Sequence, residues 1–553
     1  MTAAPMTPAP MTTGEAVIAT LIAHGIDTLY ALPGVHNDPL FDACARDPEH
    51  IRVLHPRHEQ ASAYMALGAA LVTGRAQVCA AVPGPGLLNT AAALLCAYGM
   101  DAPVLALAGQ IPSFAIDRGL GYLHELPDQL GLLRHLTKFA ARIRAPSEAS
   151  ALVATALAAA TTPRRRPVAL ECGIDVWGAT APVTLSAPIP PTPAPIDSAA
   201  IDRAAALIAK AERPLIVAGG GALDAAPELR ALAERLAAPV MSFRRGRGIL
   251  PSTHPLAVSL TEGHRLWEHA DLVIGVGTRL LRPLADWGTD AGLRVIRIDA
   301  DPEEPGRLHR PDAALLGDAA SVLAALLAAL PTPPRPARAG ELAALHAWFA
   351  ERLAPLAPQL GFLRAIRAAL PADGILVEDV TQLAFVARLA WEVDAPRRYI
   401  SPGYQDALGW GYGTALGAQA ARPGRAVVAL LGDGGFMYQA AELATAMRHG
   451  LPVVAVVMDD GAFGNVRRIQ QQAFGNRLIA CDLVNPDFVA FAESFGARAW
   501  RADSPAALER ALRAALAAGG PAVIHVRVGE MPSPWGLIGL PRVRGPAGRP
   551  AFP

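Results

Sequence analysis

The segment Ala426-Val427-Val428-Ala429-Leu430-Leu431-Gly432-Asp433-Gly434 joins an apolar run to an acidic turn. A second apolar run, Leu451 to Met458, ends in Asp459-Asp460-Gly461. Each run is typical of a buried parallel strand, and the stretch from Tyr438 to Arg448 between them has helical spacing. Because a strand–helix–strand unit brings the carboxyl ends of both strands to one sheet edge, the two acidic turns are predicted to lie side by side.

These two turns have the chemistry of a metal and phosphate site. Carboxylate oxygens are hard donors that suit Mg²⁺, and glycines let backbone N–H groups approach a phosphate closely. The alternative is that Gly432 to Gly435 is only a strand-to-helix turn and that Asp459-Asp460-Gly461 is a hairpin or loop. The ordered combination of both motifs, one helix and one strand apart, favours the metal site.

The motifs resemble those of the thiamine diphosphate (ThDP) enzymes of the acetolactate synthase, benzaldehyde lyase and benzoylformate decarboxylase superfamily, over roughly residues 12 to 530. In that family the aspartate of Gly-Asp-Gly, the second residue of a later Asn-Asn pair and a backbone carbonyl two residues further on bind Mg²⁺. The resemblance therefore implies that the metal ligands are Asp433, Asp460 and the carbonyl of Ala462. It also implies a cofactor-binding segment made of Gly432, Asp433, Gly434, Gly435 and Phe436.

This chain has Asp459-Asp460 where the family has Asn-Asn. The substitution adds negative charge beside a diphosphate. Either Mg²⁺ offsets this charge or Asp459 points away into a polar cap.

Glu59 stands at the predicted start of a helix, after the short predicted strand Ile51 to His55. The resemblance implies that Glu59 hydrogen-bonds N1′ of the ThDP aminopyrimidine and passes it a proton, which activates the thiazolium carbon. We expect burial to raise its pKa toward working pH. The alternative is an ordinary acidic residue in the first turn of a helix. The run Val82-Pro83-Gly84-Pro85-Gly86-Leu87-Leu88-Asn89 favours the cofactor role, because it matches the family turn that leads into a helix lining the active site, and Val82 is a predicted substrate contact.

Other positions follow from the resemblance alone. Leu408 matches the bulky residue that bends ThDP, although a core leucine in a glycine-rich turn explains it equally well. The carbonyl of Asp406 would accept from the cofactor amino group, and Gln382 matches a diphosphate contact. Asn465 occupies a position near the substrate that is usually apolar, so we expect it to contact a polar substrate group.

The segment His124-Glu125-Leu126-Pro127-Asp128 departs from the synthase pattern of Phe-Gln-Glu before an aspartate. Glu125 matches the glutamine linked with carboligation, and His124 replaces an apolar residue. Both are candidate catalytic residues, because a histidine here can move protons between water and substrate. The alternative for His124 is a solvated or satisfied loop side chain.

Composition excludes several classes of protein. The 49 basic and 49 acidic residues balance, so no electrostatic footprint for nucleic acid or an anionic membrane exists. No apolar run is long enough to cross a bilayer. We expect the first dozen residues to be a disordered tail rather than a targeting peptide, and the protein to be cytoplasmic with reduced cysteines. These cysteines are Cys44, Cys79, Cys96, Cys172 and Cys481.

Two proline-rich stretches, Ala187 to Pro195 and Pro331 to Pro336, read as linkers. The chain is therefore predicted to be α/β, with three doubly wound parallel-sheet domains. Their expected bounds are 12–182 (pyrimidine-binding), 196–330 (central) and 341–530 (diphosphate- and Mg²⁺-binding), with a C-terminal tail at 531–553. Predicted central strands are Pro214 to Ala218, Leu272 to Val276 and Val295 to Ile298.

The central domain contains Gly219-Gly220-Gly221 after a predicted strand, as phosphate-binding loops do. Acetolactate synthases bind FAD in this domain, and Gly275-Val276-Gly277-Thr278-Arg279 resembles their pattern. The acidic pair and arginine that follow in synthases are replaced by Leu280-Leu281-Arg282, so FAD is the less favoured expectation.

The sequence thus predicts a ThDP- and Mg²⁺-dependent enzyme that decarboxylates a 2-oxo acid and joins the product to an acceptor, as acetolactate synthases do. The alternatives are a carbon–carbon lyase or simple decarboxylase acting on an aldehyde, acyloin or 2-oxo acid, and a non-catalytic scaffold. In the family, the matching glutamate reaches ThDP on a neighbouring subunit. We therefore expect a homodimer or homotetramer.

Overall fold

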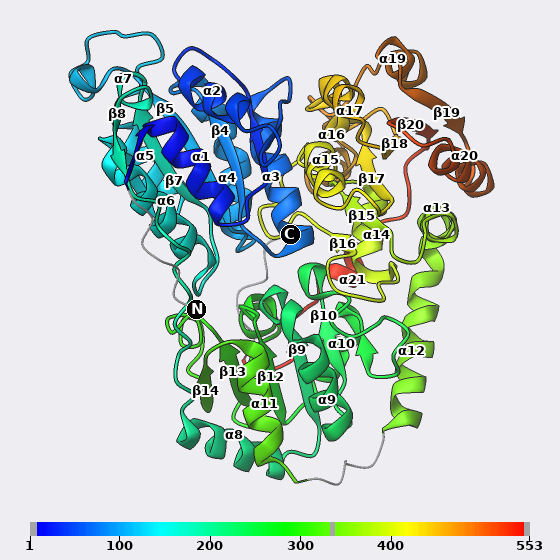
Figure 1. The fold of residues 1–553 in the computed structure, drawn as a ribbon. Helices are drawn as coiled ribbons and strands as arrows, with labels where there is room; N and C mark the ends of the chain where they lie inside the picture. Colours follow the sequence, from blue (N-terminus) through cyan, green and yellow to red (C-terminus); the bar gives the residue numbers. More distant parts are fainter. Residues whose placement is uncertain (1–7, 332–337, 547–553) are drawn as a thin grey trace.

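The computed structural model of the protein describes residues 8–331 and 338–546 (Figure 1). Three six-stranded sheets, each parallel throughout, form three domains. The predicted α/β fold class is thus confirmed. In Figure 1 the first and third domains lie side by side above the central domain.

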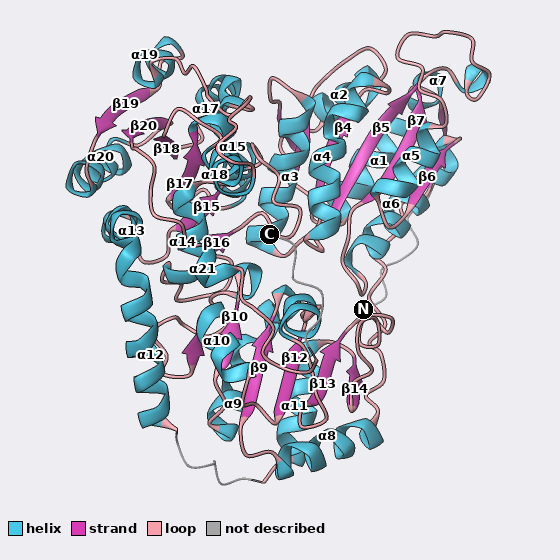
Figure 2. Ribbon diagram, turned by 180° about the vertical axis from the view of Figure 1, so that it is seen from behind, coloured by secondary structure: helices cyan, strands magenta, loops and turns pink. Residues whose placement is uncertain are grey.

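The N-terminal sheet has the strand order β3-β2-β4-β5-β7-β6. Its strands are β2 (Thr28–Ala31), β3 (Arg52–Leu54), β4 (Gln77–Ala81), β5 (Val104–Gln110), β6 (Ala140–Ile143) and β7 (Val168–Gly173). Its helices are α1 (Thr13–Ala23), α2 (Asp38–Arg46), α3 (Glu59–Thr73), α4 (Pro85–Gly99), α5 (Gln129–Leu136), α6 (Pro146–Thr161) and α7 (Ile174–Trp177). They cover both faces of the sheet (Figure 2), as a doubly wound fold requires.

The central sheet has the order β11-β10-β9-β12-β13-β14. Its strands are β9 (Pro214–Ala218), β10 (Val240–Ser242), β11 (Ala257–Val258), β12 (Leu272–Val276), β13 (Arg294–Asp299) and β14 (Ala313–Leu316). Its helices are α8 (Ser198–Lys210), α9 (Ala226–Leu236), α10 (Leu260–Trp267) and α11 (Ala319–Ala329). The three strands predicted here are therefore present.

The C-terminal sheet has the order β16-β15-β17-β18-β20-β19. Its strands are β15 (Ile375–Glu378), β16 (Tyr399–Ile400), β17 (Val427–Gly432), β18 (Val453–Asp459), β19 (Arg498–Ala502) and β20 (Ala522–Arg527). Its helices are α12 (Ala339–Leu353), α13 (Ala357–Ala369), α14 (Gln382–Ala390), α15 (Gly411–Ala421), α16 (Asp433–Met437), α17 (Leu443–His449), α18 (Gly464–Ala473), α19 (Phe488–Ser494), α20 (Pro505–Ala518) and α21 (Trp535–Ile538).

The helix predicted between the two acidic turns is broken. It begins at Asp433 rather than Tyr438, and α16 and α17 are separated by a 3₁₀ turn at Ala440–Glu442. At the break, Gln439 donates a hydrogen bond of 2.6 Å to the carbonyl of Gly409. Helical periodicity alone does not report this side-chain contact with a distant loop.

Helices α3 and α15 join the first and third domains through direct backbone contact, and they lie side by side in Figure 1. A side chain on Gly68 would collide with the carbonyl of Thr414, and one on Gly417 would collide with the carbonyl of Met65. Small residues at these crossings let the two backbones touch. Glu59 and the predicted diphosphate-binding segment are therefore carried by two domains in direct contact.

The expectation of a disordered first dozen residues is wrong for part of that segment. Ala9–Thr12 forms strand β1, which pairs antiparallel with β8 (Thr180–Val183). Thr12 also caps α1 through a reciprocal hydrogen bond with Glu15, so its backbone groups are satisfied. Residues 1–7 lie outside the described residues.

The first proline-rich linker has neither helix nor strand from residue 184 to 197, and the second lies mostly outside the described residues. The C-terminal tail packs on the central domain as far as residue 546. Ile538 and Leu540 are buried in an apolar cluster with Trp267 and Trp287. Arg544 donates to the carbonyl of Trp267 at 2.6 Å.

Across residues 8–331 and 338–546, no helix combines the length and the apolar character needed to cross a membrane. The five cysteines are buried free thiols.

Candidate active site

The two acidic turns meet at the carboxyl edge of the C-terminal sheet, as predicted. Gly432 on β17 is in register with Met458 on β18, so Asp433 and Asp459 leave the sheet at the same level. Asp433 is almost fully buried, and one carboxylate oxygen accepts a 2.7 Å hydrogen bond from Asn485. Burial raises the pKa of Asp433 to about 6, opposed by the Asn485 hydrogen bond and reinforced by the charge of Asp460.

Asp459 turns into a polar cap, which was one of the two arrangements considered from the sequence. Its Oδ2 lies 2.8 Å from Nε2 of His525, and its Oδ1 accepts from Asn485 at 2.8 Å. Burial alone would raise the pKa of Asp459, but the hydrogen bonds from His525 and Asn485 lower it below its usual range. The Asp459 carboxylate is thus bound by His525 and Asn485, while its charge still raises the pKa of Asp433 and Asp460.

Asp460 faces Gln382 instead. Its Oδ2 accepts a hydrogen bond from the Gln382 amide, and its Oδ1 accepts from the N–H of Ala462 at 3.2 Å. Burial raises its pKa. Reciprocal backbone bonds between residues 461–463 and 481–483, of 2.8 and 2.9 Å, fix the peptide at Ala462.

The donor set fits a Mg²⁺ ion. It consists of two carboxylates held by neutral amide donors and an adjacent backbone carbonyl, all hard oxygen ligands. Burial raises the pKa of both Asp433 and Asp460, and the charge of Asp460 adds to the rise at Asp433. Asn485 donates to Asp433 and Gln382 donates to Asp460, and the binding of a metal by Asp433, Asp460 and the carbonyl of Ala462 stays a prediction.

The segment after β17 is packed too tightly for side chains. A Cβ on Gly434 would lie 2.7 Å from the ring of Phe463, and one on Gly435 would lie 3.1 Å from Asp379 Oδ2 and 3.3 Å from Leu408 Cδ1. Leu408 is half-buried and lies beside the predicted diphosphate-binding segment. Its role in bending a cofactor stays a prediction.

The sequence reasoning missed Asp379, which organises the glycine-rich loop that carries Leu408. It follows β15 directly, and its carboxylate accepts N–H bonds from Gly409 at 3.2 Å and Gly411 at 3.1 Å. Burial raises its pKa to about 6, against the effect of the backbone donors. The sequence signal that could have found Asp379 is its position directly after an apolar strand, like that of Asp433 after β17.

Asp406 is anchored by two arginines that the sequence reasoning also missed. Arg388 donates to it at 2.7 and 3.2 Å, and Arg244 of the central domain donates at 2.7 Å. Burial alone would raise the pKa of Asp406, but the two guanidinium groups lower it. The Asp406 backbone has a φ of 46°, a left-handed conformation that this anchoring sustains. Its carbonyl is thus held in a defined place, as its predicted cofactor role requires.

Glu59 begins α3 and is half-buried. Its Oε2 accepts from Asn89 at 3.0 Å, and its Oε1 lies 3.3 Å from the position of a Cβ on Gly86. Glu442 accepts from the N–H groups of Arg57 and His58, both at 3.0 Å, and so anchors the start of the helix. The predicted turn after Val82 therefore does lie against Glu59.

The loop with His124 and Glu125 touches the same turn. The carbonyl of His124 lies 2.5 Å from the position of a Cβ on Gly84, and His124 itself has a φ of 65°. Glu125 instead closes its own loop by accepting N–H bonds from Gly121 at 2.6 Å and Tyr122 at 2.9 Å. These bonds lower the pKa of Glu125. A catalytic role for Glu125 stays a prediction.

Asn465 lies at the start of α18, and its Oδ1 accepts from Trp535 Nε1 at 2.9 Å and from Arg468. The polar end of Asn465 is thus used to hold the C-terminal segment. Its contact with a substrate stays a prediction.

The predicted glycine loop of the central domain follows β9. The N–H groups of Gly219 and Gly221 donate to the carbonyls of Val276 and Gly277, both at 3.0 Å. The guanidinium carbon of Arg245 lies 3.0 Å from the position of a Cβ on Gly220. The two N–H groups thus donate to carbonyls of a neighbouring loop, and FAD binding stays a prediction.

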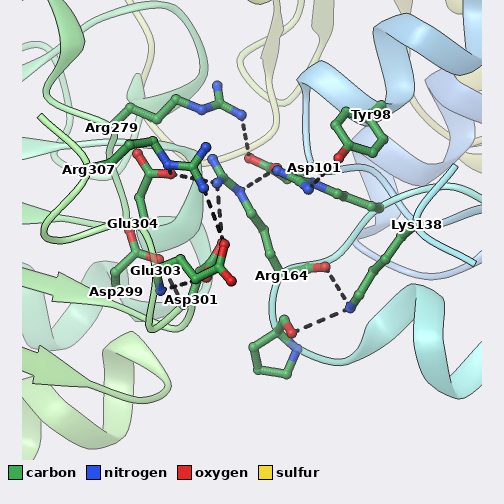
Figure 3. A network of polar contacts seen from close by, with 12 residues as sticks. Tyr98, Asp101, Lys138, Arg164, Arg279, Asp299, Asp301, Glu303, Glu304 and Arg307 are labelled. Atoms are coloured by element: carbon green, nitrogen blue, oxygen red, sulfur yellow. Dashed lines mark hydrogen bonds and ion pairs between the residues drawn. The ribbon is translucent and has the colours of Figure 1, made fainter. Parts of the chain in front are cut away.

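Beside this loop, an ionic network fastens the N-terminal domain to the central domain (Figure 3). Arg164 donates to Asp101 at 2.7 Å and to Glu304 of the central domain at 2.8 Å. Burial alone would lower the pKa of Arg164, but these carboxylates raise it. Lys138 holds the connecting segment by donating to the Arg164 carbonyl at 3.0 Å. The network therefore stabilises the domain arrangement.

Three parts of the chain match described protein families. Residues 11–132 match the thiamine pyrophosphate enzyme N-terminal TPP binding domain, residues 201–326 the central domain, and residues 379–526 the C-terminal TPP binding domain. The chain belongs to the thiamine pyrophosphate enzymes. The resemblance inferred from the motifs is thereby confirmed.

Relatives of this thiamine pyrophosphate enzyme include a probable decarboxylase and several acetolactate synthases. A probable 2-ketoarginine decarboxylase of Pseudomonas aeruginosa is 35% identical over 535 residues, covering 94% of each chain. A probable acetolactate synthase large subunit of Methanocaldococcus jannaschii is 32% identical, covering 93% of this chain and 91% of the relative. The acetolactate synthase isozyme 2 large subunit of Escherichia coli is 30% identical, covering 94% and 96%.

Proposed function

We propose that this protein uses ThDP and Mg²⁺ to decarboxylate a 2-oxo acid and releases the remaining acyl group as an aldehyde. One observation supports a proton, rather than a second carbonyl compound, as the acceptor. Glu125, the residue matched to the carboligation glutamine, uses its carboxylate to accept hydrogen bonds within its own loop, and the backbone carbonyl of His124 lies against the turn at Gly84. Because the residue matched to carboligation is held within its own loop, we favour protonation of the product over attack on a second carbonyl.

When bound, ThDP would supply a carbon nucleophile for the 2-oxo group and an electron sink for the electron pair left by CO₂. Asp433, Asp460 and the carbonyl of Ala462 would hold Mg²⁺ against its diphosphate. Glu59 would hold the proton at N1′, and the Asp406 carbonyl would orient the amino group. The apolar contacts of Leu408 and Val82 would exclude water from the reacting carbon.

A second candidate is carboligation of acetolactate synthase type, and the similarity to the synthases supports it. Two relatives with that name are 32% and 30% identical over nearly the whole chain. The two functions share every cofactor contact and differ only in the acceptor.

Product analysis separates the candidates. The purified protein, loaded with ThDP and Mg²⁺, is given pyruvate, phenylglyoxylate and a 2-oxo acid with a terminal guanidinium group. Equal amounts of CO₂ and aldehyde support decarboxylation, CO₂ with acyloin or acetohydroxy acid supports carboligation, and no turnover of any substrate refutes both. Glu59→Gln should lose turnover while ThDP binding, followed by tryptophan fluorescence, is retained. Glu49→Gln, at an exposed site, should behave as the wild type.

A further inference from the structure

One buried glutamine side chain holds the turn that follows Val82. Gln129 is the first residue of α5 and has no exposed surface. Its side-chain oxygen accepts a 3.2 Å hydrogen bond from the N–H of Gly84. Its Nε2 donates to the carbonyl of Gly109 at 2.9 Å and to Oε2 of Glu171 at 3.0 Å. The Gln129 amide therefore ties the turn to strands β5 and β7.

The backbone of this turn depends on such a tie. Gly84 has a φ of 58° and a ψ of −119°, a combination that is open to glycine and strained for other residues. Gly84 is also buried, so its N–H needs an acceptor within the protein. The side-chain oxygen of Gln129 supplies that acceptor and so favours this conformation of the turn.

Glu171 determines which way the Gln129 amide points. Carboxylate and carbonyl oxygens can only accept, so the amide nitrogen has to face Glu171 and Gly109, and the amide oxygen is left for the turn. Glu171 has no exposed surface, and Arg142 on β6 pairs with it at 2.5 Å and so offsets its charge. A neutral amide at position 171 could both donate and accept, and it would fix the orientation of Gln129 less firmly.

The turn leads directly to both oxygens of the Glu59 carboxylate. Gly84 is the residue that precedes helix α4, and Asn89 in this helix donates to Oε2 of Glu59 at 3.0 Å. A Cβ on Gly86, in the first turn of α4, would lie 3.3 Å from Oε1 of Glu59. A shift of the start of α4 would therefore change the surroundings of this carboxylate.

We infer that Gln129 and Glu171 are positioning residues for Glu59, acting through the turn at Gly84 and helix α4. This inference rests on the cofactor role of Glu59 in the proposed function. Neither residue contacts Glu59 itself among the hydrogen bonds of the described residues, so each acts through the turn. Because the proposed metal and diphosphate contacts are on the C-terminal domain, displacing Glu59 should slow its proton transfer more than it weakens ThDP binding.

The first test needs no cofactor. Gln129→Met keeps most of the length of the side chain and removes both polar atoms. Amide hydrogen exchange, measured by mass spectrometry on the ThDP-free protein, should become about tenfold faster or more in the peptide spanning residues 82–89. Unchanged exchange in this peptide would overturn the inference.

The matched control is Gln419→Met. Gln419 is 1% exposed and donates to the carbonyls of Arg422 and Arg425 at 3.2 and 3.0 Å. This variant also removes a buried amide with two carbonyl partners, at the end of α15. It should leave exchange in the peptide spanning residues 82–89 as in the wild type.

The second test follows the exchange of the thiazolium C2 hydrogen of bound ThDP with heavy water, by NMR after acid quenching and without substrate. In Gln129→Met the rate should fall about 10- to 100-fold, with the Kd for ThDP changed about threefold at most. Gln419→Met should keep the wild-type rate. A wild-type rate in Gln129→Met, or an equal fall in both variants, would contradict the positioning role.

Glu171→Gln tests the route from Glu171 to the turn. It should slow the C2 exchange about threefold or more in the wild-type background and add nothing in Gln129→Met, because Glu171 acts through Gln129. Equal slowing in both backgrounds would refute this route.

The exchange measurement also separates the inference from the proposed function. Fast C2 exchange in the wild type without turnover of any 2-oxo acid would refute the proposed function, and the rates of the variants would still decide the role of Gln129. Exchange in the wild type no faster than in free ThDP would overturn both.

Discussion

Replacing Arg388 by methionine should damage both the stability of the fold and the affinity for ThDP. The Arg388 side chain is almost fully buried and bridges Glu378 on β15 to Asp406 in the cofactor loop. Its Nε donates to Glu378 at 2.7 Å, and its other nitrogens donate to Asp406 at 2.7 and 3.2 Å. Methionine keeps most of the length of the side chain and removes the charge.

The structure sets the size of each effect. Glu378 has no exposed surface and would keep only the hydroxyl donors of Tyr399 and Ser401 as hydrogen-bond partners, so its charge would lose the ion pair with Arg388. Loss of one partner from a buried pair costs about 3–5 kcal/mol of unfolding free energy. Asp406 would keep Arg244. The loop would lose one charge-assisted hydrogen bond, which contributes about 1.5–3 kcal/mol. If ThDP binding has to order the loop at this cost, the Kd for ThDP rises about 10- to 150-fold.

Urea unfolding of the cofactor-free protein measures the first effect, and fluorescence titration with ThDP at saturating Mg²⁺ measures the second. The matched control is Arg46→Met, which breaks a surface pair with Asp42 and should cost about 0–1 kcal/mol. Adding Glu378→Gln to Arg388→Met should recover part of the stability, because it removes the stranded charge, and should leave the ThDP defect. A loss of stability below 1 kcal/mol, or a double variant less stable than the single one, would refute the account of Arg388 as the partner of a buried charge.

Three further predictions test other parts of the site. Asp433 has a raised pKa of about 6 and must be ionised to bind Mg²⁺, so protons compete with the metal. The Mg²⁺ affinity measured by calorimetry should therefore be about tenfold weaker at pH 5 than at pH 7. An affinity independent of pH would be incompatible with this carboxylate as a ligand. Glu59 and the metal site that hold one ThDP can come from different subunits. In that case, mixing inactive Glu59→Gln with inactive Asp433→Asn and letting the subunits exchange should leave one site in four intact and restore about a quarter of wild-type turnover. No recovery, with subunit exchange proved by mass spectrometry, would place both groups in one subunit. Arg244→Met should raise the Kd for ThDP by about tenfold while Arg203→Met, at an exposed site, leaves it unchanged; equal values for the two variants would show that the central domain does not support the cofactor loop.

Much of the fold could be predicted because its signals are local. Apolar runs followed by acidic or glycine turns predicted β9, β12, β17 and β18 within one or two residues. The adjacency of Asp433 and Asp459 followed from the geometry of one crossover. The strand at Ala9–Thr12 could not be predicted, because its partner lies about 170 residues further along the chain and its own sequence is rich in proline.

The candidate site was predictable only in part, because some of its residues act through contacts that are distant in the sequence. Asp433, Asp460 and Glu59 stand in motifs whose local spacing carries the chemistry. Arg388 and Asp379 act through contacts with a loop some 20 to 30 residues away, and a buried arginine in a helix has no distinctive pattern in a single sequence.

The Asp459-Asp460 pair shows how a departure from a family pattern can be absorbed by the structure. A second aspartate beside a diphosphate would repel it if its charge faced the metal. Here β20 lies next to β18, and His525 on β20 reaches Asp459 at 2.8 Å, while Asn485 donates to both Asp459 and Asp433. His525 and Asn485 thus bind the Asp459 carboxylate within the protein, and its charge acts on the predicted metal ligands only by raising the pKa of Asp433 and Asp460.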